Sequence, residues 1–348
     1  MYSFRNDYSE GAHPKVLQAL ADTNLRQTVG YGMDPCCQAA ADTIRRLCAA
    51  PDAAVHFLVG GTQVNLVTID AFLQSYEAVV AAQTGHVSTH ETGAIEATGH
   101  KVIAMPGTDG KLTPAAIAAA AAQHCAQPGV YDEHMVLPRM AYISDATELG
   151  TVYTKAELTA LRAACDAHGM CLYLDGARLA QALTAAGNDL RPEDLPQLCD
   201  AFYIGGTKNG LLFGEAMVIV NDALKPGFRR AMKRSGAMLA KGRLLGVQFA
   251  AALEQDLWLD MGRHANAQAQ RIAAALSNLG VPMYVPSPTN QIFPILPDDQ
   301  IARLQERVAF HTNTRVDETH QAVRFVTSWA TTDAQVDALL AVLNEVLG

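Results

Sequence analysis

One lysine, Lys208, lies in a glycine-rich segment (GGTKNG, residues 205–210) that directly follows the apolar run 201–204. The run predicts a strand, so we expect the lysine in a turn where the strand ends. Glycines on both sides allow close backbone approach to a ligand, and an amine with a lowered pKa is a nucleophile. The segment is not a P-loop, which has GxxxxGK followed by Ser or Thr. Taken alone, it fits an ordinary surface lysine at least as well.

A carboxylate and a guanidinium follow another short strand. The apolar run 171–174 ends in Asp175-Gly176-Ala177-Arg178. As an isolated pair, Asp175 and Arg178 would form a local salt bridge. At the inner end of a buried parallel strand, however, the carboxylate needs a partner, and a protonated pyridine nitrogen would supply one. An amine that holds an aldehyde and an acid that keeps a ring nitrogen protonated are two requirements of pyridoxal 5'-phosphate.

The third requirement of that cofactor is a site for its phosphate. The turn GGTQ (residues 60–63) lies between a predicted strand and a predicted helix, so the first amides of the helix point out of a glycine turn. Such amides and the helix dipole bind anions, and Thr62 adds a hydroxyl. The same turn could be a helix cap without a ligand. Together with Lys208 and Asp175, it indicates a pyridoxal phosphate site.

Two histidines, His86 and His90, are four residues apart and would share one face of a helix. Zinc ligands have this spacing, but a zincin motif has Glu directly after the first His, whereas Glu91 follows the second. A second interpretation is a surface helix start that Ser88 or Thr89 caps. The third interpretation fits the cofactor, with the flat ring of His86 over the pyridine and His90 near the substrate. No metal site is predicted.

An arginine, Arg324, interrupts the apolar strand pattern of residues 322–327. It could face water from an edge strand. Alternatively it could bind a substrate carboxylate through two parallel hydrogen bonds, a geometry that suits Arg better than Lys. The sequence leaves both interpretations open.

Composition limits the class of protein. The chain has 348 residues, a formal charge of -9 and no block of Lys or Arg, which argues against nucleic acid and anionic lipid as partners and favours a small molecule. No apolar run could span a bilayer and no secretory signal is visible, so we expect a cytoplasmic globular protein. Seven cysteines without a CxxC pair predict reduced, mostly buried thiols rather than a zinc knuckle or disulfides.

Short apolar runs alternate with helical patterns up to about residue 220, which predicts βαβ units and a mainly parallel sheet. The predicted strands are 54–58, 78–82, 102–105, 136–143, 171–174, 201–204 and 216–220, with helices at 62–75, 114–126 and 155–168. A second, α+β region follows, with predicted helices at 263–279 and 332–347 and strands at 283–285, 292–295 and 322–327. We predict an N-terminal arm (1–11), a large cofactor-binding domain (12–245) and a small C-terminal domain (246–348).

Nine segments, in their order and spacing, carry a resemblance that covers nearly the whole chain. They are NDYS (6–9), YGMD (31–34), GTQVN (61–65), HVSTHETG (86–93), ATELGTVY (146–153), DGAR (175–178), GGTKNG (205–210), GEA (214–216) and RFVTSW (324–329). The chain resembles the threonine aldolase family of the beta-eliminating lyase superfamily, particularly its low-specificity bacterial branch, which includes phenylserine aldolases. The resemblance implies a fold-type I, pyridoxal phosphate-dependent transferase-like α/β fold, with a mainly parallel seven-stranded sheet and a smaller C-terminal α+β domain.

The resemblance also implies roles around the cofactor. Lys208 would hold the aldehyde of pyridoxal 5'-phosphate covalently, Asp175 would pair with the ring nitrogen, and His86 would stack on the ring. The groups implied to bind the phosphate are Gly61, Thr62 and Thr207, with Lys241 reaching it from a neighbouring subunit. Such enzymes complete their sites across a dimer interface, so a homodimer or homotetramer is implied.

On the substrate side, Arg178, which also borders the cofactor, would hold the amino acid's carboxylate together with Arg324 and Asn6. Three positions depart from the family pattern: Asn6 stands where many relatives have Ser, Glu148 where other branches have His, and His90 where close relatives tend to have Asp. The base that takes the proton of the substrate hydroxyl therefore stays open between His86, His90 and a water molecule held near Glu148.

The implied activity is reversible cleavage of L-β-hydroxy-α-amino acids, of the threonine, allo-threonine or phenylserine type, to glycine and an aldehyde. The nearest alternatives are β-elimination, transamination or racemisation, because the fold and its cofactor do not decide which bond breaks. A non-catalytic ligand-binding protein is a further alternative, against which an intact Lys208 and Asp175 argue.

Overall fold

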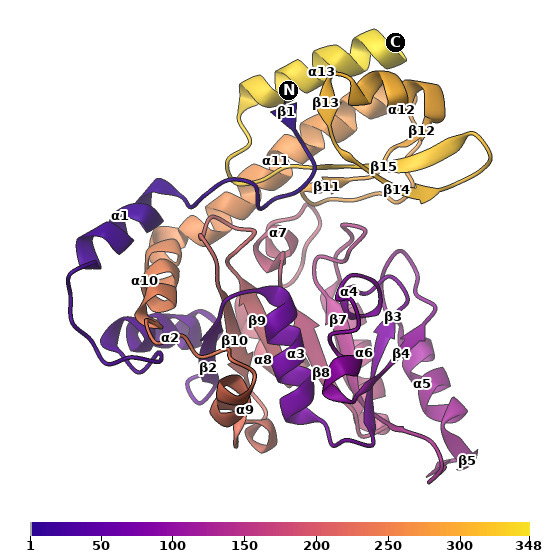
Figure 1. The fold of residues 1–348 in the computed structure, drawn as a ribbon. Helices are drawn as coiled ribbons and strands as arrows, with labels where there is room; N and C mark the ends of the chain where they lie inside the picture. Colours follow the sequence, from indigo (N-terminus) through magenta and orange to yellow (C-terminus); the bar gives the residue numbers. More distant parts are fainter. Residues whose placement is uncertain (1) are drawn as a thin grey trace.

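A computed structural model describes residues 2–348 and contains a seven-stranded sheet in the large domain (Figure 1). In sheet order the strands are β2 (Ala54–Leu58), β10 (Glu215–Ile219), β9 (Ala201–Gly205), β8 (Cys171–Asp175), β7 (Leu137–Ser144), β3 (Glu77–Ala82) and β4 (Lys101–Met105). Strand β10 is antiparallel to both neighbours, and the other pairs are parallel. The mainly parallel sheet predicted from the sequence is confirmed, and all seven predicted strands form within one residue of their predicted bounds.

Both faces of the sheet are buried, because successive side chains of each strand enter different cores. On β3, for example, Val80 packs into one core and Val79 into the other. Helices α3 (Gly61–Phe72) and α9 (Phe228–Arg234) cover one face. The opposite face is covered by α2 (Pro35–Leu47), α5 (Pro114–Gln123), α6 (Lys155–Ala167), α8 (Leu195–Leu198) and α10 (Arg243–Ala252). This two-sided burial explains why the strands read as continuous apolar runs rather than as alternating patterns.

The C-terminal part is built around strand β15 (His320–Val326). It pairs antiparallel with β11 (Gln291–Ile292), β12 (Ile295–Pro297) and β14 (His311–Arg315), and helices α11 (Leu257–Asn278), α12 (Asp298–Gln305) and α13 (Asp333–Leu347) pack with these strands. The smaller α+β region predicted from the sequence is therefore confirmed.

Several details of this region differ from the sequence prediction, including helix α12, which was not predicted. The predicted strand 283–285 is wrong, because only an isolated bridge joins Met283 to Pro294. The predicted strand 292–295 is split between β11 and β12, because Pro294 has no N–H to continue the ladder. Strand β14 was not predicted, since its sequence HTNTR is exposed throughout and carries no apolar pattern.

The N-terminal arm joins the C-terminal part rather than the large sheet. Strand β1 (Tyr2–Ser3) pairs parallel with β13 (Val308–Ala309), and Phe4 is buried in the small core. Residue 1 of the predicted arm lies outside the described residues. Helix α1 (Pro14–Thr23) then packs against α10.

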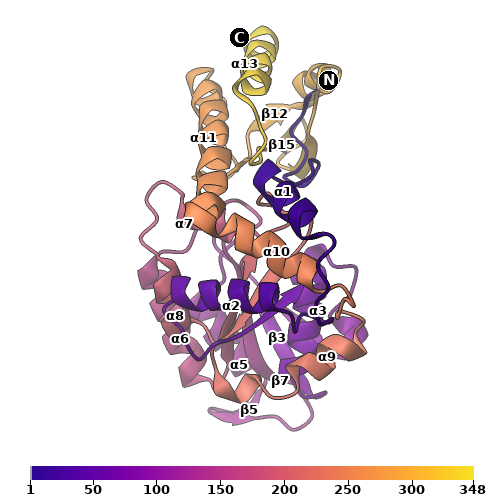
Figure 2. The ribbon, with the colours of Figure 1, turned by 90° about the vertical axis from the view of Figure 1, so that its left-hand side faces the viewer.

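Helix α11 connects the two parts and rises from the large domain into the small one (Figure 2). Its Trp258 and Met261 belong to the large core, whereas Ala269 and Ile272 belong to the small core. The predicted domain boundary at 245/246 falls inside α10. We propose instead that the two domains share α11.

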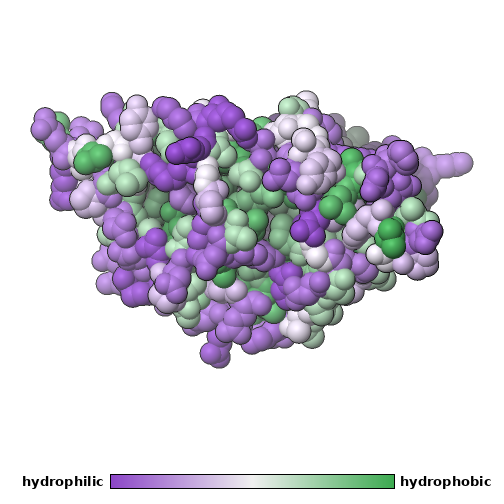
Figure 3. All heavy atoms as spheres, turned by 90° about the horizontal axis from the view of Figure 1, so that it is seen from below, coloured by the Kyte–Doolittle hydropathy of each residue, from purple (hydrophilic) through white to green (hydrophobic). Residues whose placement is uncertain are grey.

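Hydrophilic side chains dominate the rim of the face remote from the small domain, with apolar groups in patches between them (Figure 3). Within residues 2–348, no helix combines the length and the apolar character needed to cross a bilayer. All seven cysteines are free thiols, and four of them are buried.

Candidate active site

The parallel strands β7, β8 and β9 end side by side at the edge of the large sheet that faces the small domain (Figure 1). Ser144, the last residue of β7, is paired in register with Asp175, the last residue of β8. Strand β9 ends at Gly205, three residues before Lys208. Adjacent parallel strands thus bring the predicted carboxylate and the predicted amine to one edge, as ligand sites of open α/β sheets require.

Two glycines allow the lysine turn to lie against the turn that follows Asp175. A Cβ atom on Gly205 would stand 2.5 Å from the carbonyl oxygen of Ala177, and one on Gly176 would stand 1.8 Å from that of Tyr203. Any larger residue at these positions would push the two turns apart. The glycines flanking the candidate residues therefore serve close packing, and neither has a left-handed φ.

Lys208 lies partly exposed in this turn. Burial of the amine and the neighbouring Arg178 guanidinium lower the pKa of Lys208, against the opposing effect of nearby carboxylates, first Asp7 and then Asp175. A lowered pKa increases the fraction of neutral, nucleophilic amine. Beside the lysine, the hydroxyl of Thr207 accepts a hydrogen bond of 3.0 Å from the amide of Gly214, so this predicted phosphate ligand is part of the same turn.

Asp175 is buried, and both of its carboxylate oxygens accept hydrogen bonds. Tyr142 donates to Oδ2 at 2.6 Å and Tyr203 to Oδ1 at 2.5 Å, while Asn65 donates to Oδ2 at 3.0 Å. Burial works to raise the pKa of Asp175, but the nearby His86 and these three donors lower it overall. The carboxylate is therefore held ionised, as pairing with a protonated ring nitrogen requires.

The turn before α3 fits a phosphate. Gly60, the cap residue of the helix, has an extended backbone and makes no side-chain hydrogen bond. The first amides of the helix therefore have no side-chain cap. A Cβ on Gly60 would meet no atom within 4 Å, which indicates open space beside these donors. Gly61 packs more tightly, since its Cβ would lie 3.1 Å from the hydroxyl of Tyr203. Free amides with room before them suit the phosphate predicted at Gly61 and Thr62.

His86 begins a single helical turn, α4 (His86–Thr89), after β3. Its ring nitrogen Nδ1 lies 2.8 Å from Oε1 of Glu91, and its ring centroid is 5.7 Å from that of His90. The interpretation of Ser88 or Thr89 as a helix cap is wrong. Gly85 is the cap residue, and the two hydroxyls donate instead to backbone carbonyls behind them.

His90 and Glu148 differ as candidate bases. His90 is exposed, and partial burial of the ring and the neighbouring His86 lower the pKa of His90, which favours the neutral imidazole. Burial raises the pKa of Glu148, which favours the protonated acid. Its Oε1 also accepts hydrogen bonds from the Ser144 hydroxyl at 2.7 Å and the His86 amide at 2.8 Å. Glu148 is thus held by two neighbours through one oxygen, whereas the ring of His90 is exposed.

The N-terminal arm supplies a residue that sequence reasoning missed. Asp7 is buried and accepts two hydrogen bonds from Arg178, at 2.7 Å from Nε and 3.1 Å from Nη2. Asn290 of the small domain also donates to Asp7, at 2.9 Å. Arg178 therefore pairs with Asp7, and the alternative of a local salt bridge with Asp175 is wrong. Position 7 lies inside the NDYS segment, but no spacing pattern predicts a partner 171 residues away.

Arg324 lies on β15, which is the central strand of the small sheet, so its interpretation as an edge-strand residue is wrong. Its Nε is buried and has no hydrogen-bond partner among the described residues. Burial and the nearby Arg178 lower the pKa of Arg324, while Asp7 opposes them. Two guanidinium groups thus approach each other with one acid between them, an arrangement that favours an added carboxylate.

Asn6, predicted to hold the substrate carboxylate, is half-buried next to Asp7. Its Oδ1 accepts hydrogen bonds from the amide of Tyr8 at 3.0 Å and the hydroxyl of Ser9 at 2.9 Å. The side-chain oxygen therefore stabilises the turn of the arm, and only the amide nitrogen of Asn6 remains for a ligand.

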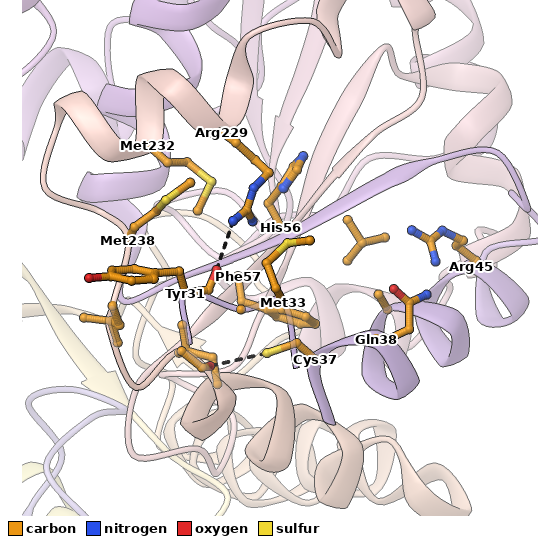
Figure 4. Close-up of a pocket in the computed structure, with 16 residues that line it drawn as sticks. Tyr31, Met33, Cys37, Gln38, Arg45, His56, Phe57, Arg229, Met232 and Met238 are labelled. Atoms are coloured by element: carbon orange, nitrogen blue, oxygen red, sulfur yellow. Dashed lines mark hydrogen bonds between the residues drawn. The ribbon is translucent and has the colours of Figure 1, made fainter. Parts of the chain in front are cut away.

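Within the described chain, Lys241 makes no hydrogen bond or ion pair with the residues that meet at the sheet edge. It is exposed in the turn before α10, where the amide of Tyr31 donates to the carbonyl of Ala240 at 3.2 Å. The same surface has a cavity of about 150 Å³ (Figure 4). Arg229, His56 and Tyr31 line this cavity, and Nη2 of Arg229 donates to the Tyr31 carbonyl at 3.1 Å. None of the predicted cofactor or substrate residues lines it.

The chemistry that the site offers follows from its donors and acceptors. An amine with a lowered pKa, an ionised buried carboxylate and free helix amides supply the three groups that pyridoxal phosphate needs, so the residues fit this cofactor. Within residues 2–348, no cluster of three or more His, Cys, Asp or Glu side chains has a metal-binding arrangement.

Comparison with known proteins gives consistent results. The family model of the beta-eliminating lyases matches residues 4–298. The chain is 33% identical to the low-specificity L-threonine aldolase of Pseudomonas aeruginosa, over 99% of this chain and 98% of that protein. A threonine aldolase structure from Leishmania major has 46% identity and a TM-score of 0.96, with both chains covered completely. An aspartate aminotransferase from Thermus thermophilus, at 17% identity and a TM-score of 0.71, covers 99% of this chain and 90% of its own and shows a shared fold only.

Proposed function

The chain belongs to the beta-eliminating lyase family, and we propose that the residues gathered at the sheet edge carry out in it the cleavage of β-hydroxy-α-amino acids. Its activity is that of a threonine aldolase, a carbon–carbon lyase that uses pyridoxal phosphate. The observation that best supports the assignment of residues is the meeting of Lys208 and Asp175 at adjacent strand ends, with Arg178 near both Lys208 and Arg324.

Each part of the cofactor has a residue that would hold it. Lys208 would bind the aldehyde, Asp175 the ring nitrogen, and the amides of Gly61 and Thr62, with Thr207, the phosphate. The chemistry that the bound group supplies is an electron sink, which allows the Cα–Cβ bond of the amino acid to break. Because four donors, including the backbone amide of Ala177 at 3.0 Å, keep Asp175 ionised, this carboxylate would hold the ring nitrogen in its protonated form.

Arg324 orients the substrate. Its buried, unpaired Nε and its fork geometry suit the two oxygens of a carboxylate. Arg178 already uses Nε and Nη2 on Asp7, so it contributes mainly charge and its remaining nitrogen, while the amide nitrogen of Asn6 can add a donor. By holding the carboxylate, the clamp would fix the orientation of the bonds at Cα and thereby select the bond that breaks.

His86 takes the proton of the substrate hydroxyl. It is the one of the three candidate bases whose ring is held by a buried acid, Glu91, at 2.8 Å. The second candidate is His90, whose neutral ring is exposed. Glu148, whose Oε1 already accepts from the Ser144 hydroxyl and the His86 amide, would hold the His86 backbone and orient a water molecule.

Product analysis tests the assigned reaction. The purified protein with pyridoxal phosphate should release glycine and an aldehyde from threonine, allo-threonine or phenylserine, each supplied as separate stereoisomers. Glycine formation also establishes which stereoisomers are preferred. Ammonia with a keto acid as the main products would instead indicate β-elimination or transamination on the same fold.

We further propose a homodimer or homotetramer with shared sites. Support comes from two large side chains on the surface, Tyr31 and Met33, which are 47% and 64% exposed. Their segment lies beside Lys241, because the amide of Tyr31 donates to the carbonyl of Ala240. In this arrangement Lys241 reaches the phosphate site of the neighbouring subunit. Mixing inactive Lys208→Ala and Lys241→Ala subunits should then restore activity, since some mixed sites regain both lysines. Sedimentation as a monomer, or no restoration of activity, would contradict shared sites.

A further inference from the structure

Glu91 is a buried acid beside the site, in contact with the ring of His86. Its side chain is fully buried, and Oε1 lies 2.8 Å from Nδ1 of His86. The same oxygen accepts a hydrogen bond of 2.7 Å from Nδ2 of Asn65. Its other oxygen, Oε2, has no partner among the described residues. An acid held this way loses hydration at one oxygen, so the fold alone gains little from it.

Asn65 donates a hydrogen bond to this acid. Its Oδ1 accepts from the hydroxyl of Tyr173 at 2.8 Å, which assigns the other terminus as the NH2 group. That group donates to both Glu91 and Asp175, at 2.7 Å and 3.0 Å. One amide thus links two carboxylates, and both act towards it as acceptors. Among residues 2–348, Oε2 meets no acceptor that could take a proton from it, so the contacts around Glu91 are those of a carboxylate that accepts.

The state of Glu91 decides the tautomer of His86. An ionised carboxylate has no proton to give, so the short contact at Nδ1 requires that the imidazole carry its proton there. The other nitrogen, Nε2, is then a bare acceptor. The main chain of the same residue is fixed too, because its amide donates to Glu148. The ring of His86 is thus held by Glu91 and its backbone by Glu148, two residues that are far apart in the sequence.

We propose that Glu91 is a positioning residue that keeps His86 in the Nδ1–H tautomer, with Nε2 free to accept the proton of the substrate hydroxyl. In that step the O–H bond breaks as an N–H bond forms at Nε2, and the electron pair of the broken bond stays on oxygen. The ring becomes cationic, and the adjacent Glu91 carboxylate stabilises its charge. The inference rests on the proposed function, because it needs His86 as the base.

The tautomer can be measured in the wild-type holoenzyme. With 15N-labelled histidine, the ring nitrogens of His86 should show Nδ1 protonated and Nε2 bare at a pH where the ring is neutral. The His86 signals are assigned by their loss in His86→Gln. A wild-type ring protonated at Nε2 instead would overturn the proposal, whatever any variant does.

A substitution tests the link to catalysis. Glu91→Gln preserves the size of the side chain but removes its charge, so kcat should fall at least about 10-fold. KM and cofactor absorbance should stay near wild-type, because Glu91 contacts neither the clamp nor Lys208. Glu91→Asp should recover part of kcat if the acid is what matters. The exposed Glu96, replaced by Gln, is the matched control and should have no effect.

The outcomes separate this proposal from the assigned activity. Wild-type protein that releases no glycine from any tested β-hydroxy amino acid contradicts the proposed function. Wild-type aldolase activity together with an unchanged kcat in a folded Glu91→Gln variant contradicts the positioning role alone. A lower kcat accompanied by an equal loss of bound cofactor would also contradict it, since that result indicates a merely structural role.

Discussion

The carboxyl edge of the large sheet and the group supplied by the arm and the small domain meet at one site, but their polar atoms are paired differently. At the sheet edge, every oxygen of Asp175 accepts hydrogen bonds. On the opposite side, Nε of Arg324 and Oδ1 of Asn290 are buried without partners among the described residues. Such an atom costs about 1–3 kcal/mol when unpaired. Asp175 thus has hydrogen-bond partners before a ligand arrives, whereas these atoms of Arg324 and Asn290 gain partners only when one binds.

The difference follows from how each region is built. Side chains at the sheet edge are fixed by strand register, with Tyr142, Tyr173 and Tyr203 on one face of three neighbouring strands. The second region depends on contacts between distant segments, above all Asp7 with Arg178 and Asn290. We therefore expect substitutions at the edge to affect the chemical step and substitutions on the opposite side to affect binding.

The largest effect is expected at the sheet edge itself. Lys208→Ala should lower kcat at least about 10³-fold, because it removes the only covalent holder of the cofactor and leaves Asp175 and the clamp unchanged. Turnover of threonine measured under saturating cofactor tests this. Lys155 is an exposed lysine that forms an ion pair with Asp194 and is not among the predicted site residues. Lys155→Ala is therefore the matched control and should keep wild-type activity. Wild-type turnover in Lys208→Ala without added amine would remove this residue from the mechanism.

An intermediate effect is expected on the opposite side. Arg324→Ala should raise KM for the amino acid about 10- to 100-fold, the loss of a charge-assisted hydrogen bond worth about 1.5–3 kcal/mol, with a smaller change in kcat. Arg315, on the neighbouring strand and exposed in an ion pair with Asp298, supplies the control Arg315→Ala. If KM is unchanged in Arg324→Ala, the comparison between a chemical side and a binding side fails.

The third effect concerns the stability of the sheet edge rather than turnover or substrate binding. Glu215, on β10, accepts a hydrogen bond of 3.0 Å from the amide of Gly206, and burial raises the pKa of Glu215 from 4.5 to about 8. A carboxyl group with a raised pKa stabilises the fold fully below its unfolded value. That contribution is lost as pH rises from about 4.5 through about 8.

Glu215→Gln should therefore remove a decline in the free energy of unfolding of up to about 1.4 kcal/mol per pH unit across this window. Urea unfolding at several pH values measures it, with the exposed Glu306→Gln as control. An identical pH dependence in wild-type and Glu215→Gln protein would show that Glu215 is already ionised in the native state.

Much of the sheet edge was predictable because its signals are local. The strands read as apolar runs, and a glycine turn with a reactive side chain followed three of them, at Gly61, Asp175 and Lys208. Parallel strands bring their carboxyl ends together, so these three positions had to share an edge. The tyrosines that donate to Asp175 were not predictable, because within an apolar strand a Tyr reads as another core residue.

The opposite side was harder to predict. Arg324 was singled out because a charge in an apolar strand is unusual, but the sequence did not tell an edge strand from a central one. The partner of Arg178 was missed because Asp7 comes from the arm, and Glu91 was noted only in relation to a metal motif. Neither pairing has a fixed spacing along the chain.

The sequence by itself determined where the strands lie along the chain, where the glycine turns follow them, and that an amine and an acid stand at strand ends. These signals are local, because periodicity and backbone freedom act between near neighbours. Only the tertiary structure decided how the charges pair. Arg178 pairs with Asp7 and not with Asp175, while Asp175 accepts from hydroxyls and an amide of other elements. A charge takes the partner that is near in space, and that distance is set by packing rather than by spacing along the chain.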